Sequence, residues 1–403
     1  MNKQDLTLLT DLYELTMMQG YYKKGQHETV VFDVFYRHNP CGNGYSVCAG
    51  LDQVIDYIKN LNFTYEDVDY LRSLHIFDDD FLQYLSGFHF TGDIYAIPEG
   101  SVVFPKEPLL KVIAPIMEAQ LVETTILNLI NHQSLIATKT SRVVYAADGD
   151  GIMEFGLRRA QGPDAGLYGA RAAIIGGCVG TSNVLAGQLF DVPVMGTHAH
   201  SWIMTFPDEY TAFKYYAELY PDNCTLLVDT YDTLKSGVPN AIRVFQEFKD
   251  AGKPLKKYGI RLDSGDLAYL SKKARKMLDE AGFPDASICA SNDLDEYLLH
   301  DLKAQGAAIN SWGVGTHLIT SKDCPSFGGV YKLSAIKNEN GEFIPSTIKL
   351  SFQNAAINQK LCTYLKAKQG ADIPIEDVKN CLVDDNRVVR KGVKRITVKV
   401  FPQ

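Results

Sequence analysis

The sequence lacks any apolar stretch that approaches the roughly 20 residues needed to cross a bilayer. Its N-terminal segment, MNKQDLTLLTDLYELTMMQG, is too acidic and too often interrupted by polar residues to predict a signal peptide. The eight cysteines stand singly and form no Cys-x-x-Cys pair, so neither a zinc site nor a disulfide framework is indicated. These absences predict a cytoplasmic protein with reduced thiols and no membrane partner.

An excess of positive charge is also lacking. The chain of 403 residues holds 48 acidic and 40 basic side chains, which gives a formal net charge of −8. This balance argues against a nucleic-acid partner, and an anionic substrate would need a local basic site. With 46% hydrophobic and 22% charged residues, the composition is that of an ordinary globular protein, and the length predicts two or three domains.

The N-terminal part, residues 1–135, mixes short helical and strand signals. One helical stripe, apolar at Leu12, Leu15 and Met18, is expected to face the core and to end at the glycine after the two lysines. The segment after residue 330 has hairpin character, with NENG as its turn, and so resembles the N-terminal part more than the middle. We therefore expect an α/β sandwich domain built from both chain ends, residues 1–135 and 331–403.

The central part, residues 136–330, alternates apolar strand-like runs with amphipathic segments. Such alternation predicts parallel strands joined by crossover helices, either as an α/β barrel or as a doubly wound sheet. In an α/β barrel the chemistry lies on loops at the carboxyl ends of the strands. The expected strands are GIMEF (151–155), VPVMG (192–196), CTLLVD (224–229), KYGIRLD (257–263), ASICAS (286–291) and INSWGVG (309–315).

Polar and charged residues follow these runs. Arginines hold phosphates, carboxylates hold a metal or sugar hydroxyls, and glycine loops expose N–H groups to a phosphate. Together they indicate a polyanionic substrate with Mg²⁺, although single members also have structural explanations, such as helix capping by Asp263 or Asp266. The set comprises Arg158, Arg159, His198, His200, Asp229, Asp232, Arg261, Asp263, Ser264, Asp266, Ser291, Asn292, Asp293 and the sequence GVGT at 313–316.

The closely spaced pair His198 and His200 has three interpretations: metal binding, phosphate chemistry and a purely structural role. A His-x-His pair can bind a metal if Asp229 and Asp232 supply further ligands. Phosphate chemistry is possible because a neutral imidazole is a competent nucleophile. The residues alone leave all three interpretations open.

Seven motifs, taken in order, resemble those of the nicotinate phosphoribosyltransferase family: DLYELTM, MEFGLRRAQG, GTSNVLAGQLFDVPVMGTHAHSW, LLVDTYDT, IRLDSGDL, ASNDL and GVGT. The resemblance implies the irregular α/β barrel of type II phosphoribosyltransferases beside the sandwich domain. It also implies a reaction, in which nicotinate and phosphoribosyl diphosphate give nicotinate mononucleotide and diphosphate in the salvage route to NAD. Coupling to ATP hydrolysis through a phosphorylated histidine, with Mg²⁺ as cofactor, is implied as well.

The resemblance assigns roles to individual residues. His200 matches the phosphohistidine, whereas His198 occupies a variable position, and Asp229 is expected near the diphosphate and Mg²⁺. The implied catalytic residues are His200, Asp229, Arg261 and Asp263. The implied nicotinate contacts are Tyr13, Phe155, Arg158, Ser182 and Arg261. The implied ribose and phosphate contacts are Asp263, Asn292, Gly313, Gly315 and Thr316. The implied diphosphate and ATP contacts are Arg37, Arg159 and His200.

The resemblance further implies a homodimer with shared active sites, in which Tyr13 closes the neighbour's site. Relatives that prefer nicotinamide carry an aspartate at the position of Ser182, so the serine here favours nicotinate as the substrate.

Three alternative functions differ in the residues that they require. A quinolinate phosphoribosyltransferase would need more basic groups and has no use for His200. A non-catalytic nucleotide sensor would not need to retain the catalytic set. A phosphosugar aldolase would need a Schiff-base lysine, and none of these strand ends carries one.

Overall fold

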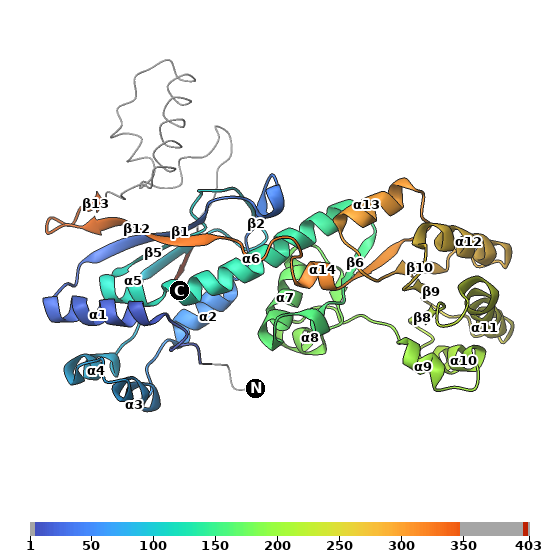
Figure 1. Cartoon of the computed structure of the whole chain (residues 1–403), viewed down its shortest axis with the longest axis horizontal. Helices are drawn as coiled ribbons and strands as arrows, with labels where there is room; N and C mark the ends of the chain where they lie inside the picture. The colour runs from blue at the N-terminus through green and yellow to red at the C-terminus, as the bar shows by residue number, and fades with distance from the viewer. Residues whose placement is uncertain (1–4, 347–397, 402–403) are drawn as a thin grey trace, which may run out of the picture. The chain divides into compact units, whose positions relative to one another are not determined.

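The computed structural model describes residues 5–346 and 398–401 of the chain, and the chain divides into two compact units. The first unit combines Met1–Ser134 with Ser326–Gln403, and the second is Leu135–Pro325. Both ends of the chain therefore belong to one unit and the middle of the chain forms the other, as the colouring in Figure 1 shows.

An antiparallel sheet forms the centre of the first unit. Its strand order is β13-β12-β1-β5-β3-β14, so strands from the two ends of the chain are neighbours. The expected hairpin joins β12 to β13, and in its NENG turn the carbonyl of Asn338 accepts the N–H of Gly341 at 3.0 Å. The strands are β1 (Thr29–Tyr36), β3 (Asp93–Ala96), β5 (Leu110–Pro115), β12 (Gly329–Lys337), β13 (Phe343–Pro345) and β14 (Val398–Phe401), while β2 (Ser46–Val47) and β4 (Val102–Val103) pair separately.

Helices lie beside this sheet, and α1 packs against α5 (Figure 1). The helix α1 ends where Gly25 adopts a φ of 65°, a left-handed conformation that glycine takes without steric cost. Leu15 is buried as expected, but the expectation for Leu12 is wrong, because Leu12 is exposed and Glu14 takes the buried position. The helices are α1 (Leu12–Lys24), η1 (Pro40–Gly42), α2 (Leu51–Asn60), α3 (Tyr65–Ser73), α4 (Asp79–Leu85), α5 (Ile116–Leu121) and α6 (Glu123–Ala146), which continues into the second unit.

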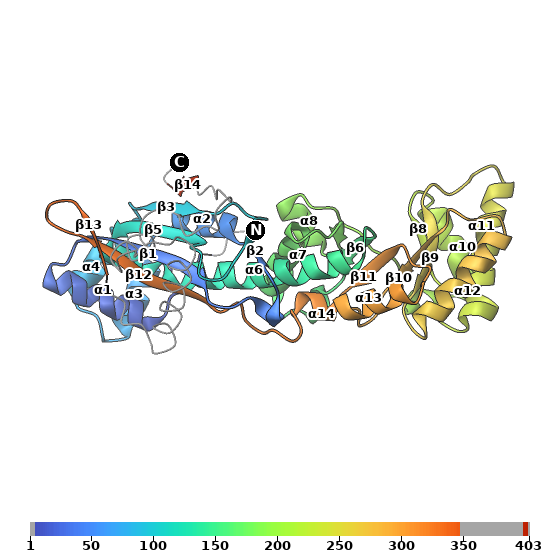
Figure 2. The same ribbon diagram turned by 90° about the horizontal axis from the view of Figure 1, so that it is seen from above.

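A parallel sheet forms the centre of the second unit. Its strand order is β7-β6-β11-β10-β9-β8, and every neighbouring pair runs parallel. The sheet curls into half of a barrel with helices along it (Figure 2), which confirms the expected irregular α/β barrel. The strands are β6 (Gly151–Glu154), β7 (Gly180–Thr181), β8 (Cys224–Leu227), β9 (Tyr258–Leu262), β10 (Ser287–Ala290) and β11 (Ser311–Val314).

Amphipathic helices connect these strands. The helix α12, for example, buries Leu267 and Leu278 and is followed by Gly282 with a φ of 84°. Among the residues that the structure describes, no helix combines the length and the apolar composition that crossing a bilayer requires. The helices are η2 (Leu157–Arg159), α7 (Pro163–Ile175), α8 (Val184–Phe190), α9 (His200–Met204), α10 (Glu209–Leu219), η3 (Thr233–Gly237), α11 (Val238–Asp250), α12 (Leu267–Glu280), α13 (Glu296–Ala304) and α14 (Thr316–Ile319).

The strand expected at 192–196 is wrong. Only Val194 forms a β-bridge there, to Thr181, and the strand beside β6 is the two-residue β7. Pro193 has no N–H group to donate, so a ladder cannot continue through it. The segment thus follows the edge of the sheet for one bridge and then leaves it as the loop that leads to His200.

Parallel pairing determines where the functional residues lie. Because all six strands run in the same direction, their carboxyl ends meet at one edge of the sheet. The candidate residues lie in the loops that follow β6, β8, β9, β10 and β11 and in the segment between α8 and α9 that leads to His200. This edge is therefore the place at which to look for a site.

Candidate active site

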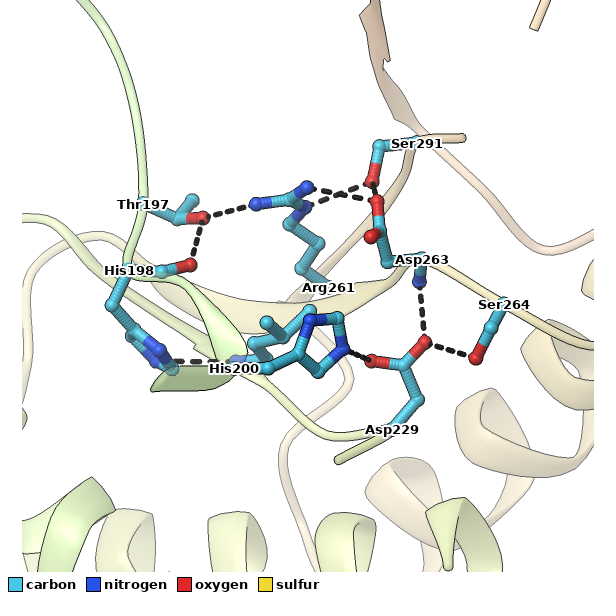
Figure 3. Close-up of polar contacts among 9 residues, drawn as sticks. Thr197, His198, His200, Asp229, Arg261, Asp263, Ser264 and Ser291 are labelled. Atoms are coloured by element: carbon cyan, nitrogen blue, oxygen red, sulfur yellow. Dashed lines mark hydrogen bonds and ion pairs between the residues drawn. The ribbon is translucent and has the colours of Figure 1, made fainter. Parts of the chain in front are cut away.

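The guanidinium of Arg261 joins three loops at the carboxyl-end edge of the parallel sheet (Figure 3). Arg261 lies in β9, and its Nη2 donates to Oδ1 of Asp263 at 2.8 Å. Its Nε donates to Oγ of Ser291 at 2.8 Å, and its Nη1 donates to Oγ1 of Thr197 at 2.9 Å. Ser291 also donates its hydroxyl to Asp263. Because the Arg261 side chain is largely shielded from water, these charge-assisted bonds hold the three loops together.

Asp229, in the loop after β8, links His200 to the same network. Its Oδ1 lies 3.2 Å from Nε2 of His200, while its Oδ2 accepts the N–H of Asp263 at 2.8 Å and the hydroxyl of Ser264 at 2.6 Å. The Asp229 side chain is only 2% exposed, whereas that of His200 is 40% exposed. A carboxylate facing Nε2 selects the tautomer that carries its proton there, so the lone pair of His200 is on Nδ1.

His198 faces the sheet instead of the network. Its Nε2 accepts the N–H of Leu227 at 3.2 Å, and its ring meets the ring of Tyr216 edge-on, with centroids 4.6 Å apart. Burial, together with the positive charge of Arg261, lowers the pKa of His198 to about 4. The ring is therefore neutral at physiological pH and remains an acceptor, which anchors the loop that leads to His200.

Phe155 follows β6 and lies beside the network. Its N–H donates to the carbonyl of Val314 at 2.8 Å. Its ring lies over Gly313, where an added Cβ would come within 2.5 Å of ring atoms, so any larger residue would displace the ring. The guanidinium carbon of Arg261 is 5.9 Å from the centroid of the Phe155 ring. An aromatic face and a guanidinium thus adjoin, which is an arrangement suited to a planar, anionic ligand.

The loops after β10 and β11 complete this edge. Asn292 and Asp293 have φ values of 85° and 33°, so the chain turns sharply directly after Ser291. Gly315 precedes Thr316, the first residue of α14, and a Cβ on Gly315 would lie 3.2 Å from the carbonyl oxygen of Phe155. The two loops are in register because β10 pairs with β11.

The remaining predicted residues are outside this hydrogen-bond network. Arg158 and Arg159 are exposed on η2. Ser182 is half-buried after β7, and its N–H donates to the carbonyl of Glu154 at 2.9 Å. Tyr13 and Arg37 belong to the first unit, where both are exposed.

Two of the candidate aspartates are helix caps. Asp232 accepts two backbone N–H groups at the start of η3, and Asp266 accepts the N–H of Tyr269 at the start of α12. The capping interpretation is therefore correct for Asp266 and wrong for Asp263, which binds Arg261.

These positions also test the metal interpretations. Within residues 5–346 and 398–401, no group of three or more His, Cys, Asp or Glu side chains is arranged to hold a metal. The His-x-His interpretation is wrong, because Nε2 of His198 faces a backbone N–H and Asp232 caps a helix. Both oxygens of Asp229 accept hydrogen bonds, so Asp229 would have to release one of them before it could bind Mg²⁺.

Sequence reasoning assigned no role to Thr197, although it stands in the same short motif as His200. Ser264 and Ser291 were among the strand-end residues, but nothing in their type distinguished them from ordinary loop serines. Glu154 lies in the motif MEFGLRRAQG, but the sequence assigns it no role, because an apolar strand run does not show what a carboxylate within it contacts. Each of these four side chains acts by hydrogen bonding to a neighbour that is distant in sequence or on another segment.

Comparison with known proteins finds matches to both parts of the chain. The model of the nicotinate phosphoribosyltransferase (NAPRTase) N-terminal domain matches residues 8–131, and that of the NAPRTase family matches residues 151–342. Over 347 residues the chain is 54% identical to the nicotinate phosphoribosyltransferase of Bacillus subtilis, an alignment that covers 86% of this chain and 70% of the relative. The chain belongs to the nicotinate phosphoribosyltransferase family.

Further relatives support this family membership and the fold. The human nicotinate phosphoribosyltransferase is 34% identical over 387 residues, which cover 82% of this chain and 72% of the human one. The crystal structure of human nicotinic acid phosphoribosyltransferase matches with a TM-score of 0.74 and 32% identity, and covers 84% of this chain and 76% of that one. Nicotinate-nucleotide pyrophosphorylase from Pyrococcus furiosus, at 22% identity and a TM-score of 0.64, shares the fold; the match covers 93% of this chain and 98% of that one.

Burial of neutral His198 makes the stability of this family member depend on pH. Its pKa is about 4 in the folded chain and near 6.5 in an unfolded one. The stabilisation from neutral His198 is therefore complete above about pH 6.5 and is lost as the pH falls toward 4.

Gln accepts a hydrogen bond but does not titrate, so His198→Gln should flatten the fall in unfolding free energy between about pH 7 and pH 5. Urea unfolding measures this fall. His300→Gln, which replaces an exposed histidine, is the control, and parallel curves for wild type and His198→Gln would contradict the assignment.

Proposed function

We propose that this chain transfers the phosphoribosyl group of phosphoribosyl diphosphate to nicotinate, and that His200 couples ATP hydrolysis to this transfer. The products are nicotinate mononucleotide and diphosphate, in the salvage route to NAD. The observation that carries the proposal is the identity of 54% to a nicotinate phosphoribosyltransferase, over an alignment that includes most of the chain. The network of Arg261, Asp263, Asp229 and His200 supplies the chemical groups that such a reaction requires.

The pyridine ring is assigned to the part of the edge next to Phe155. The guanidinium of Arg261 and the exposed Arg158 are the cations assigned to the carboxylate of nicotinate, because a planar guanidinium both stacks and pairs with a carboxylate. Ser182 is neutral, so it does not repel a carboxylate as an aspartate would. The site therefore favours nicotinate over nicotinamide.

The phosphoribosyl group is assigned to the loops after β9, β10 and β11. The described hydrogen bonds of the Asp263 carboxylate are made by Oδ1, which leaves Oδ2 for the ribose hydroxyls. Asn292, Gly313, Gly315 and Thr316 are assigned to the 5′-phosphate, through backbone N–H groups and the Thr316 hydroxyl. Positioning of the two reactants and stabilisation of the developing charges supply the catalysis.

The contact between His200 and Asp229 supports an assignment of the reacting nitrogen. Asp229 holds Nε2, so Nδ1 is the nucleophile that attacks the γ-phosphorus of ATP. An Nδ1–P bond forms, the bond from the γ-phosphorus to the bridging oxygen breaks, and ADP leaves. Water later hydrolyses the phosphohistidine to free phosphate. Arg37 and Arg159 are assigned to the phosphates of ATP or to the diphosphate.

We propose Mg²⁺ as a cofactor and assign no step of the reaction to it. Mg²⁺ commonly keeps water ligands and binds through substrate phosphates plus one or two carboxylates, so a cage of protein ligands is not required. Asp229 is the candidate carboxylate, and it would exchange one of its present hydrogen bonds for the metal.

The buried thiols of Cys178, Cys224 and Cys289 support a reducing compartment, and we assign the chain to the cytoplasm.

A product assay tests the proposal directly. The wild-type chain is mixed with phosphoribosyl diphosphate, Mg²⁺ and either nicotinate, nicotinamide or quinolinate, with and without ATP. We expect nicotinate mononucleotide from nicotinate, a rate increased by ATP, and far lower turnover of nicotinamide. Turnover of quinolinate in place of nicotinate, or no turnover of any of the three, would contradict the assignment.

His200→Asn tests the coupling. Asn cannot accept a phosphoryl group, so the variant should lose both labelling by γ-labelled ATP and stimulation by ATP while it retains slow synthesis. His300→Asn, which changes a histidine exposed on α13, is the control and should be labelled normally. Labelling that persists in His200→Asn would exclude His200 as the phosphorylated residue.

The shared dimer is proposed on the position of Tyr13. This side chain is 44% exposed on α1, so its ring is available to a second copy of the chain. If Tyr13 of one subunit completes the site that contains Asp263 of the other, Tyr13→Ala and Asp263→Ala homodimers should both be poorly active.

Mixing the two variants under subunit exchange should restore activity. Half of the randomly exchanged dimers combine both variants, and each of these has one intact site, so activity should approach about a quarter of the wild-type value. Proven exchange without recovery, or a fully active monomer in sedimentation-controlled assays, would contradict the shared site.

A further inference from the structure

Glu154 is the last residue of β6, and it is completely buried directly before Phe155. Its carboxylate connects two separate segments. Oε1 accepts the N–H of Gly156, in the turn that follows Phe155, and Oε2 accepts the hydroxyl of Thr181 at 2.6 Å. Its main-chain carbonyl accepts the N–H of Ser182 at 2.9 Å. Glu154 thus connects the turn after β6 to the end of β7.

These two segments carry three of the residues assigned to the pyridine substrate. The turn carries Phe155 and Arg158, and the end of β7 carries Ser182. Each segment is short, since β7 has two residues and η2 has three, so the strand ladder alone restrains them little. A side chain that bonds to both segments fixes the spacing between them.

The bonds of Glu154 extend into the structure behind the site. Thr181 Oγ1 accepts the N–H of Asn183 at 3.1 Å, and the Asn183 side chain caps α8 and donates to the carbonyl of Gly166 at 3.2 Å. The turn at Gly156 is equally restrained, because a Cβ there would lie 2.5 Å from the Ile319 side chain. Movement of Glu154 would therefore shift the Phe155 turn relative to Ser182.

We infer that Glu154 is a positioning residue that sets the affinity for the pyridine substrate by bonding Gly156 and Thr181. The inference rests on the assignment of nicotinate to this part of the edge. Burial raises the pKa of Glu154, and both the protonated and the ionised carboxyl can bond to these two partners. Bonding, and not charge, is what the role requires. Gln has the same shape, so it can accept from Gly156 and donate to Thr181.

The test compares Glu154→Gln with Glu154→Met in the full chain. Met has similar length but makes neither bond, so the KM for nicotinate should rise about tenfold while the KM for phosphoribosyl diphosphate changes less than about twofold. Glu154→Gln should remain close to wild type in both. An equal rise in both KM values, or a fall in kcat alone, would overturn the inference, as would a Gln variant that behaves like the Met variant.

Glu209→Met is the matched control for loss of a buried, bonded carboxylate. Glu209 lies on α10, is 3% exposed and accepts hydrogen bonds from Ser236 and Asn240. Both donors belong to the connection after β8. The strand β8 forms the edge of the sheet opposite β7, so this cluster is remote from the Glu154 bonds. Glu209→Met should lower thermal stability without a change in the KM for nicotinate. The same rise in nicotinate KM in Glu209→Met would show that general destabilisation explains the effect.

Two further measurements keep the result decisive. If Glu154→Met does not fold, Thr181→Val removes one of the two Glu154 bonds, together with the acceptor of the Asn183 N–H, and should give a smaller rise in nicotinate KM; no change would overturn the inference. Calorimetric binding of nicotinate reads the ring site without turnover. Weaker binding in Glu154→Met than in Glu154→Gln supports the inference even if the wild type makes no nucleotide, an outcome that would contradict the proposed reaction instead.

Discussion

The guanidinium of Arg261 is the group on which the rest of the site depends, because it bonds to residues from three loops at once. Through Asp263 the connection continues to Asp229, which accepts the N–H of Asp263 and holds the imidazole of His200. Arg261, which is assigned to the carboxylate of nicotinate, is therefore connected through Asp263 and Asp229 to the histidine assigned to phosphorylation. In the proposed reaction, a charge placed on His200 would act directly on Asp229, and from there on the loop assigned to the ribose.

The parallel sheet makes this convergence possible. Arg261 reaches Ser291 because β9 and β10 lie in register, and Gly259 in β9 leaves room for Ser287, whose Oγ would lie 2.1 Å from a Cβ at that position. Below the loops, Glu154 and His198 perform similar tasks with different chemistry. Glu154 binds neighbouring segments with its carboxylate, and His198 holds the loop before His200 against β8 with a neutral ring. Both side chains are buried, so water does not compete for their bonds.

Apolar runs correctly predict five of the six strands expected in the central domain, and the resemblance assigns roles to the residues that follow them. They failed at 192–196, where Pro193 interrupts an otherwise strand-like run, and at Leu12, where helical spacing alone does not show which neighbours cover the helix. The motif LDSGD contains two aspartates of similar appearance. Only the structure distinguishes Asp263, which binds Arg261, from Asp266, which caps α12, because the distinction depends on where the helix begins. The roles of Thr197 and Glu154 cannot be predicted from the sequence, because Thr197 meets Arg261 and Glu154 meets Thr181, and both partners are distant along the chain.

The most direct test of the central claim is the catalytic efficiency of Arg261→Lys. Lys keeps the charge but lacks the planar fork that bonds Thr197, Asp263 and Ser291 together. The matched control is Arg275→Lys, because Arg275 bonds Asp279 and the carbonyls of Ala286 and Phe283 away from the carboxyl-end edge. If Arg261 organises the site, Arg261→Lys should lose about 10²-fold or more in kcat/KM for both nicotinate and phosphoribosyl diphosphate with unchanged circular dichroism, while Arg275→Lys stays near wild type. Near-wild-type kcat/KM in Arg261→Lys, or equal losses in the two variants, would contradict that role.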